Sequence, residues 1–517
     1  MAAGADAMLS GELTACAGSV GPGSLHFING LYESHRNRAP VVLIASQHVR
    51  DEIGFDFPQE VDYKSVYAPC SVFCEEIRTA KQARRMTVAA AQAALSKRGV
   101  AVLIVPADLA EEKVPEKGPG FSVHTAEPVV TPSGDELRRI ADALNAGERV
   151  AIYGGSGCAG AQDRILELAS KLKAPVARTS RAKDWLEPDN PFDVGMTGFF
   201  GIESGYEALM RCDTLLLLGC DFAWRQFYPE KATIIQIDID GTHLGKRHPV
   251  DIAAIGDVGA TVNALLPLVE KRENADFLEA MLKMHAEAKA KQEDHAHKAA
   301  VPIHPQYMVE TIARHAASDA VWTADGGSAT VWCLRHVPAT GENRSMISLT
   351  HGTMANAMPQ ALGAQAAFPE RQVISLSGDG GLAMLMGDML TAVQEKLPIK
   401  VALINNGTLG FVELEMKIEG LVDHYTELQN PDFGAVASAM GWWGRRVEDP
   451  GKLDAAVAEW LGAPGPALLD VVTDRYELVM PPHVEAEKIF GTALYSAKAV
   501  LSGRAGDVAK LTKNLID

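Results

Sequence analysis

A glycine turn with one acidic residue, followed by a pair of asparagines, carries the clearest chemical signal in the sequence. Gly378-Asp379-Gly380-Gly381 comes directly after Val373 to Leu376, an apolar stretch with the composition of a buried strand. Asn405 and Asn406 follow the next such stretch, Ile399 to Ile404. A strand, a tight turn, a helix and a second parallel strand bring the two strand ends side by side, and the helix N-terminus favours a phosphate.

Asp379 and Asn406 offer the oxygen atoms that magnesium prefers in proteins. Carboxylate and amide oxygens are hard ligands, and Mg²⁺ keeps its remaining positions for a backbone carbonyl, water and phosphate oxygens. The sequence therefore predicts a diphosphate held through Mg²⁺ at this strand edge. A glycine turn alone would be a weak signal because such turns are mostly structural, so the prediction depends on its combination with the asparagines.

Alternating apolar strands and amphipathic helices predict an α/β protein with three doubly wound parallel sheets. The expected strands are Leu13 to Gly18, Val41 to Ala45, Val100 to Val105, Val150 to Tyr153, Thr214 to Leu218, Ile234 to Asp238, Ala320 to Thr323, Val373 to Leu376, Ile399 to Ile404 and Ala467 to Val472. Among the expected helices are Thr79 to Ser96 and Lys452 to Leu461. Ser133 and Glu136 form the pattern of a capping box at the start of another helix.

Changes in composition divide the chain into three domains and a tail. A polar stretch from Glu111 to Gly120 ends the first domain, which we place at residues 1–125, and a second domain covers 126–280. A stretch rich in Lys, Glu, Ala and His between about 270 and 300 predicts an exposed helix joining this domain to the third, at 281–476. Residues 477–517 are expected to form a helical tail.

Charge and composition exclude several classes of function. The formal net charge of -18 argues against a nucleic-acid partner. Seven cysteines are scattered without a C-x-x-C pair, which suits a reducing cytosol. The sequence shows neither a signal peptide nor an apolar run long enough to span a bilayer. We therefore expect a cytoplasmic protein that is soluble or at most peripheral on the inner face of the cell membrane.

Most of the chain resembles the thiamine-diphosphate (ThDP)- and FAD-dependent family of quinone-reducing pyruvate dehydrogenases and pyruvate oxidases. The stretches that carry the resemblance are Gly21-Pro-Gly-Ser-Leu-His, Gly155-Ser-Gly-Cys-Ala-Gly160, Asp193-Val-Gly-Met-Thr-Gly198, His351 to Pro359, the GDGG turn with its asparagine pair, and Leu409-Gly-Phe-Val-Glu-Leu-Glu-Met416. The resemblance implies that the three domains are a Pyr-type domain, an FAD-binding domain and a PP domain that binds the diphosphate and Mg²⁺.

The resemblance also implies a set of ThDP and metal residues. Mg²⁺ would be held by Asp379, Asn406 and the backbone oxygen of Thr408, and Met354 would support the bent cofactor. An isolated methionine would be core packing, and only its place between matching segments reverses that interpretation. The remaining ThDP residues implied are Gly352, Thr353, Gly380, Gly381, Gly407, Leu409, Gly410, Phe411 and Val412.

FAD is implied for the central domain. Gly155, Gly157 and Gly160 fit a G-x-G-x-x-G turn after a strand, which alone is a weak dinucleotide signal. Asp238, at the end of its strand, would reach the adenosine end of FAD. The residues that would line the flavin are Thr197, Gly198, Phe199, Phe200, Cys220, Asp221, Phe222, Ala223 and Trp224; the alternative for the last five is a simple loop between a strand and a helix.

The family's reaction is the oxidative decarboxylation of pyruvate to acetate and CO₂ through an enamine on ThDP. Electrons would pass through FAD to membrane ubiquinone. Phe411 matches an aromatic residue between ThDP and the flavin, Glu415 an acidic residue at the substrate pocket, and Gln59 lies in the corresponding pocket segment of the first domain. Because sites in this family form between subunits, the resemblance implies a homotetramer or at least a dimer.

Several departures from the family pattern leave alternatives open. The glutamate that protonates the aminopyrimidine would precede Met1, so the chain is expected to be a fragment of an active enzyme or a catalytically impaired subunit. Pro58 and Gly326 replace an aromatic residue and a valine, which leaves room for a 2-oxo acid bulkier than pyruvate. A carboligase of the acetohydroxyacid synthase type, with structural FAD, is the main alternative activity.

The C-terminal tail has two alternative interpretations. Val508, Leu511 and Leu515 share a helical face opposite Lys510 and Lys513, which predicts binding to membrane lipid. A helix packed on its own subunit is the alternative, and the lack of a terminal tryptophan weakens the membrane interpretation.

Overall fold

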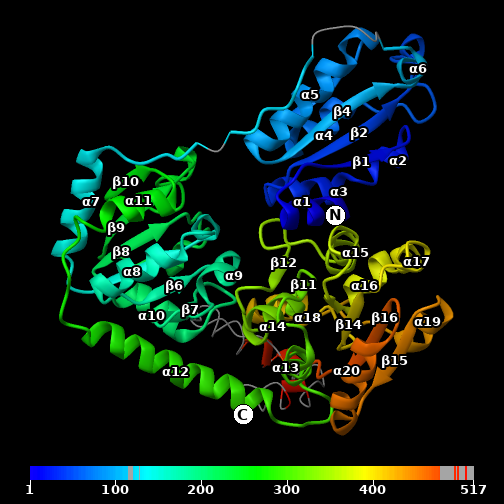
Figure 1. Cartoon of the computed structure of the whole chain (residues 1–517). Coiled ribbons are helices and arrows are strands. Elements are labelled where there is room, and N and C mark those ends of the chain that lie inside the picture. Colours follow the sequence, from blue (N-terminus) through cyan, green and yellow to red (C-terminus); the bar gives the residue numbers. More distant parts are fainter. Residues whose placement is uncertain are drawn as a thin grey trace.

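The structure, a computed structural model, describes residues 1–114, 120–126, 128–477, 494–496, 498–499, 507–508 and 510. Within this part of the chain, three separate parallel sheets are flanked by helices, as the sequence predicts (Figure 1). The central strands of the sheets are largely buried on both faces, so most of their residues are apolar.

The first sheet has four strands in the order β1-β2-β4-β3. Its strands are β1 Thr14–Gly18, β2 Val41–Gln47, β3 Phe73–Glu76 and β4 Val100–Pro106. Its longer helices are α1 Ala2–Ser10, α3 Ile28–Arg36 and α5 Ala80–Lys97. The strand at Phe73–Glu76 was not predicted because it is a short edge strand that ends in two glutamates.

The central sheet has six strands in the order β10-β9-β8-β5-β6-β7. Its strands are β5 Val150–Gly154, β6 Val176–Arg178, β7 Asp193–Met196, β8 Thr214–Leu218, β9 Thr233–Asp238 and β10 Ile252–Ile255. The helices around it include α7 Gly134–Ala146, α8 Gln162–Leu172, α9 Lys183–Leu186, α10 Glu203–Arg211 and α11 Val258–Leu265. The predicted capping box of α7 is present, because Ser133 and Glu136 exchange side-chain and backbone hydrogen bonds.

The third sheet also has six strands, in the order β12-β11-β13-β14-β16-β15. Its strands are β11 Val321–Ala324, β12 Arg344–Ile347, β13 Val373–Gly378, β14 Lys400–Asn405, β15 Trp443–Val447 and β16 Ala467–Val472. The helices used below are α13 Pro305–His315, α14 Ser328–His336, α15 Ala357–Ala367, α16 Asp379–Leu385, α18 Gly410–Ile418, α19 Phe433–Ala439 and α20 Leu453–Gly462. The predicted joining helix is α12, Asp276–Ala296, which runs from the central to the third domain (Figure 1).

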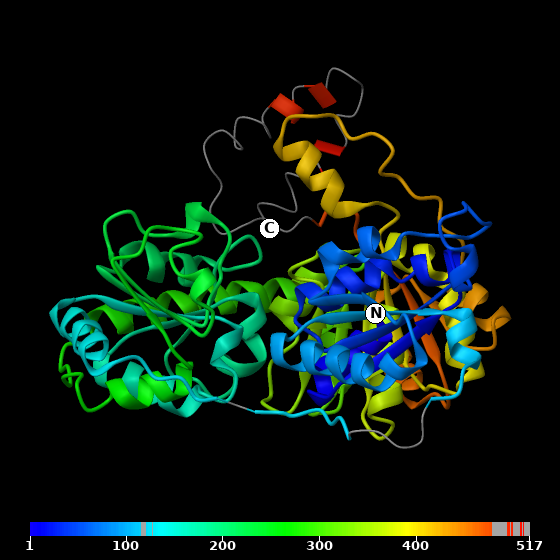
Figure 2. The same cartoon turned by 90° about the horizontal axis from the view of Figure 1, so that it is seen from above.

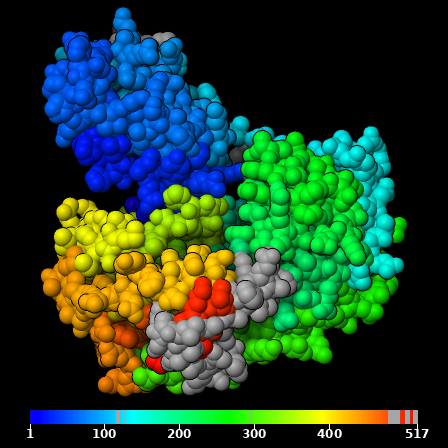
Figure 3. Space-filling model, turned by 180° about the vertical axis from the view of Figure 1, so that it is seen from behind, coloured from blue at the N-terminus to red at the C-terminus, as the bar shows by residue number. Residues whose placement is uncertain are grey.

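The first domain lies over the third, and the central domain lies beside them (Figures 2 and 3). Helices α1 and α3 face α15 of the third domain. Glu33 on α3 is buried at this junction, where it accepts hydrogen bonds from the Ser348 hydroxyl (2.5 Å) and the Gln360 amide (3.2 Å). A buried carboxylate therefore joins the two domains.

Most of the predicted helical tail, including Leu511, Lys513 and Leu515, lies outside the described residues. In the part of the chain that the structure describes, no helix combines the length and the hydrophobicity needed to cross a membrane.

Candidate functional site

The glycine turn and the asparagine pair lie side by side at the carboxyl ends of β13 and β14. One oxygen of the Asp379 carboxylate accepts the Gly380 N–H at 2.8 Å. The other accepts the Gly407 N–H and the Asn430 side-chain N–H, each at 2.8 Å. The parallel strand order thus brings the turn against the asparagine loop, as the sequence predicts.

Asp379 is a buried carboxyl whose charge a cation would stabilise. It is 3% exposed, and desolvation raises the pKa of its carboxyl although three N–H groups favour the charged form. Asn406 accepts the Thr408 N–H, and Thr408 is itself buried. Among the described residues, no three His, Cys, Asp or Glu side chains gather into a metal site. A cation at this turn would therefore depend on one carboxylate and on neutral oxygens, a set that suits Mg²⁺.

The segment around Met354 borders the same turn. A Cβ on Gly380 would lie 3.2 Å from the Met354 methyl carbon and 2.7 Å from a methyl carbon of Leu409. Ala355, the next residue, has a φ of 63° although it is not glycine. Asn356 holds this uncommon backbone in place by donating to the Ala324 carbonyl at 2.9 Å.

Asp325, at the end of β11, joins these two segments and was not predicted as a site residue. Its carboxylate accepts the Ala357 N–H at 2.9 Å and the Gly378 N–H at 3.1 Å. Burial raises the pKa of this carboxyl to about 7. Its position at the carboxyl end of a predicted strand, next to Gly326, was the signal that could have identified it.

Gly326 allows two backbone segments to approach each other. A Cβ at this position would overlap the Thr353 carbonyl oxygen and lie 2.9 Å from the Thr353 carbonyl carbon. The Gly326 N–H also donates to that oxygen at 3.2 Å. The expected extra room for substrate is thus filled by the backbone of the Met354 segment.

In the central domain, the first two glycines of the G-x-G-x-x-G turn serve close backbone packing. A Cβ on Gly155 would lie 2.7 Å from Cα of Cys220, and one on Gly157 would lie 2.7 Å from Cα of Gly219. The loops after β5 and β8 therefore touch through their main chains, which brings the two segments predicted to bind FAD together.

The residues predicted to line the flavin form an aromatic cluster. Phe199 contacts Trp224 edge to face, with ring centroids 5.2 Å apart, and Phe222 contacts Trp224 at 5.4 Å. The Cys220 side chain is buried in the same core, which raises its pKa. Thr197 is 2% exposed, and its hydroxyl has no hydrogen-bond partner among the described residues. Such a hydroxyl is suited to a polar atom of a bound group.

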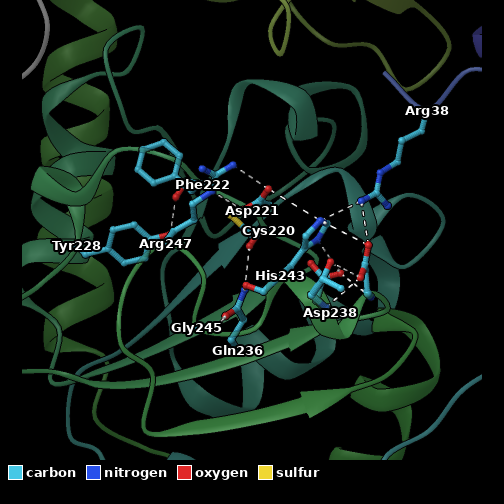
Figure 4. Close-up of polar contacts among 12 residues, drawn as sticks. Arg38, Cys220, Asp221, Phe222, Tyr228, Gln236, Asp238, His243, Gly245 and Arg247 are labelled. Carbon is cyan, nitrogen blue, oxygen red and sulfur yellow. Dashed lines mark hydrogen bonds and ion pairs between the residues drawn. The ribbon is translucent and has the colours of Figure 1, made fainter. Parts of the chain in front are cut away.

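Asp238, predicted at the adenosine end, belongs to a polar network shown in Figure 4. Its carboxylate lies 3.3 Å from Nδ1 of His243, whose other ring nitrogen lies 3.0 Å from the Arg38 guanidinium. Asp221 accepts hydrogen bonds from two nitrogens of Arg247, at 2.6 and 3.1 Å. His243 and Arg38 were not predicted, and Arg38 links this edge to the first domain.

The three predicted catalytic residues are not all brought together in one chain. Phe411 and Glu415 lie one turn apart on α18, which puts them on the same helix face. Gln59 lies on an exposed loop of the first domain with a φ of 73°, and in the described part of the chain no hydrogen bond joins it to α18. The Phe411 ring instead contacts Phe200 of the central domain, at 6.2 Å between centroids.

A cavity of about 350 Å³ lies between the central and third domains. Its lining includes Arg178, Glu187, Asp193, His285 and Arg335, none of which was predicted to bind a cofactor. Arg178 forms ion pairs there with Glu187 and Asp193. The cavity therefore gives no support to the predicted ThDP site, whose residues lie at the carboxyl ends of β13 and β14.

Comparisons with known proteins agree with this arrangement of domains. Models of the thiamine pyrophosphate (ThDP) enzyme family match in all three domains: the N-terminal TPP binding domain at residues 1–66, the central domain at 137–265 and the C-terminal TPP binding domain at 325–471.

Individual relatives match over most of the chain. A protein of Bacillus subtilis (strain 168) named as thiamine pyrophosphate-containing, YdaP, is 33% identical over all of this chain and 90% of its own length. Pyruvate oxidase of Lactiplantibacillus plantarum is 30% identical over 91% of this chain and 80% of its own. The large subunit of acetolactate synthase isozyme 2 of Escherichia coli (strain K12) is 29% identical, over 93% and 88% respectively. The chain belongs to the thiamine pyrophosphate enzyme family.

Proposed function

We propose that this chain oxidatively decarboxylates a 2-oxo acid, with pyruvate as the first candidate, and passes the electrons through FAD to a quinone. Pyruvate and water become acetate and CO₂, and two electrons and two protons pass to FAD and then to the quinone, which leaves as quinol. When bound, ThDP would supply the carbanion chemistry of decarboxylation and FAD the electron-pair acceptor.

The residues of the glycine turn fit a diphosphate held through Mg²⁺. Asp379 would bind the cation with its carboxylate, Asn406 with its side-chain oxygen and Thr408 with its backbone carbonyl. The N–H groups of Gly407 and Asn430 hold the Asp379 carboxylate in one orientation. Gly352, Thr353 and Met354, in the segment that follows β12, would support the cofactor from the same edge of the sheet, and Gly381, Gly410 and Val412 would complete its surroundings.

Glu415 and Gln59 would act on the substrate. Glu415 is exposed on α18 one turn after Phe411, so its carboxylate can accept or donate a proton at the keto acid. Gln59 would reach this pocket from the first domain of a neighbouring subunit, which makes at least a dimer, and in our proposal a homotetramer, part of the function.

The contact between Phe200 and Phe411 carries the redox part of the proposal. Phe200 belongs to the loop expected to line the flavin, and Phe411 follows the turn expected to hold ThDP. Their ring centroids are 6.2 Å apart, so one aromatic contact separates the two expected cofactor sites. Direct electron transfer between ThDP and FAD needs a short path between the two sites, and this contact is the observation from which we argue for oxidation.

Two products distinguish the proposed reaction from carboligation. We expect pyruvate to reduce an artificial quinone in the presence of ThDP, Mg²⁺ and FAD. Asp379→Asn should abolish this activity. Asp142→Asn, an exposed substitution on α7, should retain it. Acetolactate formation without quinone reduction would favour an activity like that of the acetolactate synthase relative.

Binding of the protein to lipid vesicles tests the peripheral membrane association that we propose for the tail.

A further inference from the structure

The Arg335 side chain joins the third domain to the loop that follows β7. Arg335 lies on α14, and its Nε donates to the Phe200 carbonyl at 3.1 Å. A terminal nitrogen donates to the Gly201 carbonyl at 2.8 Å. The donors of a guanidinium form a rigid fork, so this one side chain fixes two successive main-chain carbonyls of the central domain.

The surroundings of Arg335 strengthen these hydrogen bonds. Arg335 is half-buried and lines the cavity between the domains, and desolvation lowers the pKa of its guanidinium to about 10, so the group stays charged at neutral pH. Hydrogen bonds from a charged donor are stronger than those between neutral groups, and a low local dielectric strengthens them further.

The loop that Arg335 holds, residues 197–202, is internally tight. Gly198 has a φ of 95°, the Gly201 N–H donates to the Gly198 carbonyl at 2.9 Å, and the Ile202 N–H donates to the Met196 carbonyl at 3.0 Å. Because the loop is closed by its own hydrogen bonds, anchoring two of its carbonyls fixes the position of the Phe200 ring as well.

We propose that Arg335 is a positioning residue that holds this loop on the third domain and thereby keeps Phe200 against Phe411. On this inference, Arg335 sets the rate at which electrons pass from the ThDP site to the FAD site without touching either cofactor. The inference rests on the proposed function for its redox consequence, whereas the anchoring of the loop is independent of it.

Arg335→Lys is the informative variant because it keeps the charge but replaces the fork with a single ammonium group. Arg344→Lys is a matched control, since Arg344 also reaches from the third domain to the central one but stacks over the Trp185 ring of α9, with 4.0 Å from its guanidinium carbon to the ring centroid. Both variants keep the net charge, so they differ mainly in whether the loop is released.

Hydrogen exchange of the protein without cofactors tests the anchoring. In Arg335→Lys we expect the Gly201 and Ile202 amides to exchange at least about tenfold faster, because loss of one charge-assisted hydrogen bond has that effect on an opening equilibrium. In Arg344→Lys they should exchange at the parent rate. Unchanged exchange in Arg335→Lys would overturn the inference.

Anaerobic mixing of the loaded protein with pyruvate tests the redox consequence. We expect Arg335→Lys to reduce its flavin roughly tenfold more slowly than the parent at equal flavin content. The first CO₂ released per site, which precedes electron transfer to the flavin, should appear at the parent rate, whereas general structural damage would slow both steps. Equal flavin reduction in variant and parent would overturn the inference. No flavin reduction in the parent would instead overturn the proposed function, and hydrogen exchange would still decide whether Arg335 anchors the loop.

Discussion

Replacing Gly326 by alanine should push the Met354 segment away from β11. The added Cβ would overlap the Thr353 carbonyl oxygen and lie 2.9 Å from its carbon, whereas uncrowded carbon atoms lie about 3.5 to 4.0 Å apart. Overpacking of this kind costs about 1 to 3 kcal/mol, and weakening the hydrogen bond from the Gly326 N–H to Thr353 adds about 1 kcal/mol. We therefore expect the free energy of unfolding to fall by about 2 to 4 kcal/mol.

Two measurements follow for Gly326→Ala. Thermal unfolding of the protein without cofactors should shift down by roughly 5 to 10 °C. The affinity for ThDP in the presence of Mg²⁺, measured by titration calorimetry, should fall by roughly tenfold or more, because each 1.4 kcal/mol lost is about tenfold in affinity. Gly462→Ala is the control, since nothing lies within 4 Å of a Cβ at that position. If Gly326→Ala and Gly462→Ala both unfold at the temperature of the parent and bind ThDP with its affinity, the close approach of the two backbone segments is not needed for the ThDP site.

Four buried groups, three in the predicted cofactor sites and one at the junction of the first and third domains, give further predictions. Asp379→Asn should weaken Mg²⁺-dependent ThDP binding by at least about a hundredfold, and unchanged binding in calorimetry would exclude Asp379 as the metal ligand. The pKa of Asp325 is about 7 in the folded protein against 3.8 ordinarily, so the folded state binds more protons between these values and the free energy of unfolding falls as pH rises through them. In Asp325→Asn, the free energy of unfolding, measured with urea at several pH values, should depend less on pH over this range. The same pH dependence as in the parent would contradict the raised pKa of Asp325. Glu33→Ala leaves donors of Ser348 and Gln360 unpaired, so the free energy of unfolding should drop by about 2 to 4 kcal/mol, whereas the exposed Glu12→Ala should change it by less than about 0.5 kcal/mol. Thr197→Val should leave the free energy of unfolding of the protein without FAD unchanged or raised, because the hydroxyl has no hydrogen-bond partner among the described residues. It should reduce the affinity for FAD severalfold in a fluorescence titration. An affinity equal to that of the parent would show that Thr197 does not contact the flavin.

The strands at the centre of each sheet were predictable from the sequence. Thr214–Leu218 and Ala467–Val472 were predicted at their observed bounds, and Val41–Gln47 and Val373–Gly378 to within two residues at one end. These strands are largely buried on both faces, so most of their residues are apolar. The edge strand Trp443–Val447 was missed, because its residues are mostly half-buried and it contains a glycine and two adjacent arginines, so it lacks the apolar run of a buried strand.

Some residues of the site could likewise be placed from the sequence, and others could not. Asp379 and Asn406 could be placed together because consecutive parallel strands put their carboxyl ends at one edge of the sheet. Asn430 and Asp325 contact the same turn from 51 and 53 residues away in sequence, where no spacing rule connects them. The pairing of Asp238 with His243, and the contact between Phe200 and Phe411, depend on how loops and domains pack, which local patterns do not encode.

The most direct test of the proposed function is the flavin absorbance of the loaded protein after anaerobic mixing with pyruvate. With ThDP and Mg²⁺ present we predict bleaching of the flavin, one acetate formed per flavin reduced, and recovery of the oxidised spectrum on adding a quinone. A flavin that stays oxidised while pyruvate is converted to acetolactate would contradict the proposed oxidation.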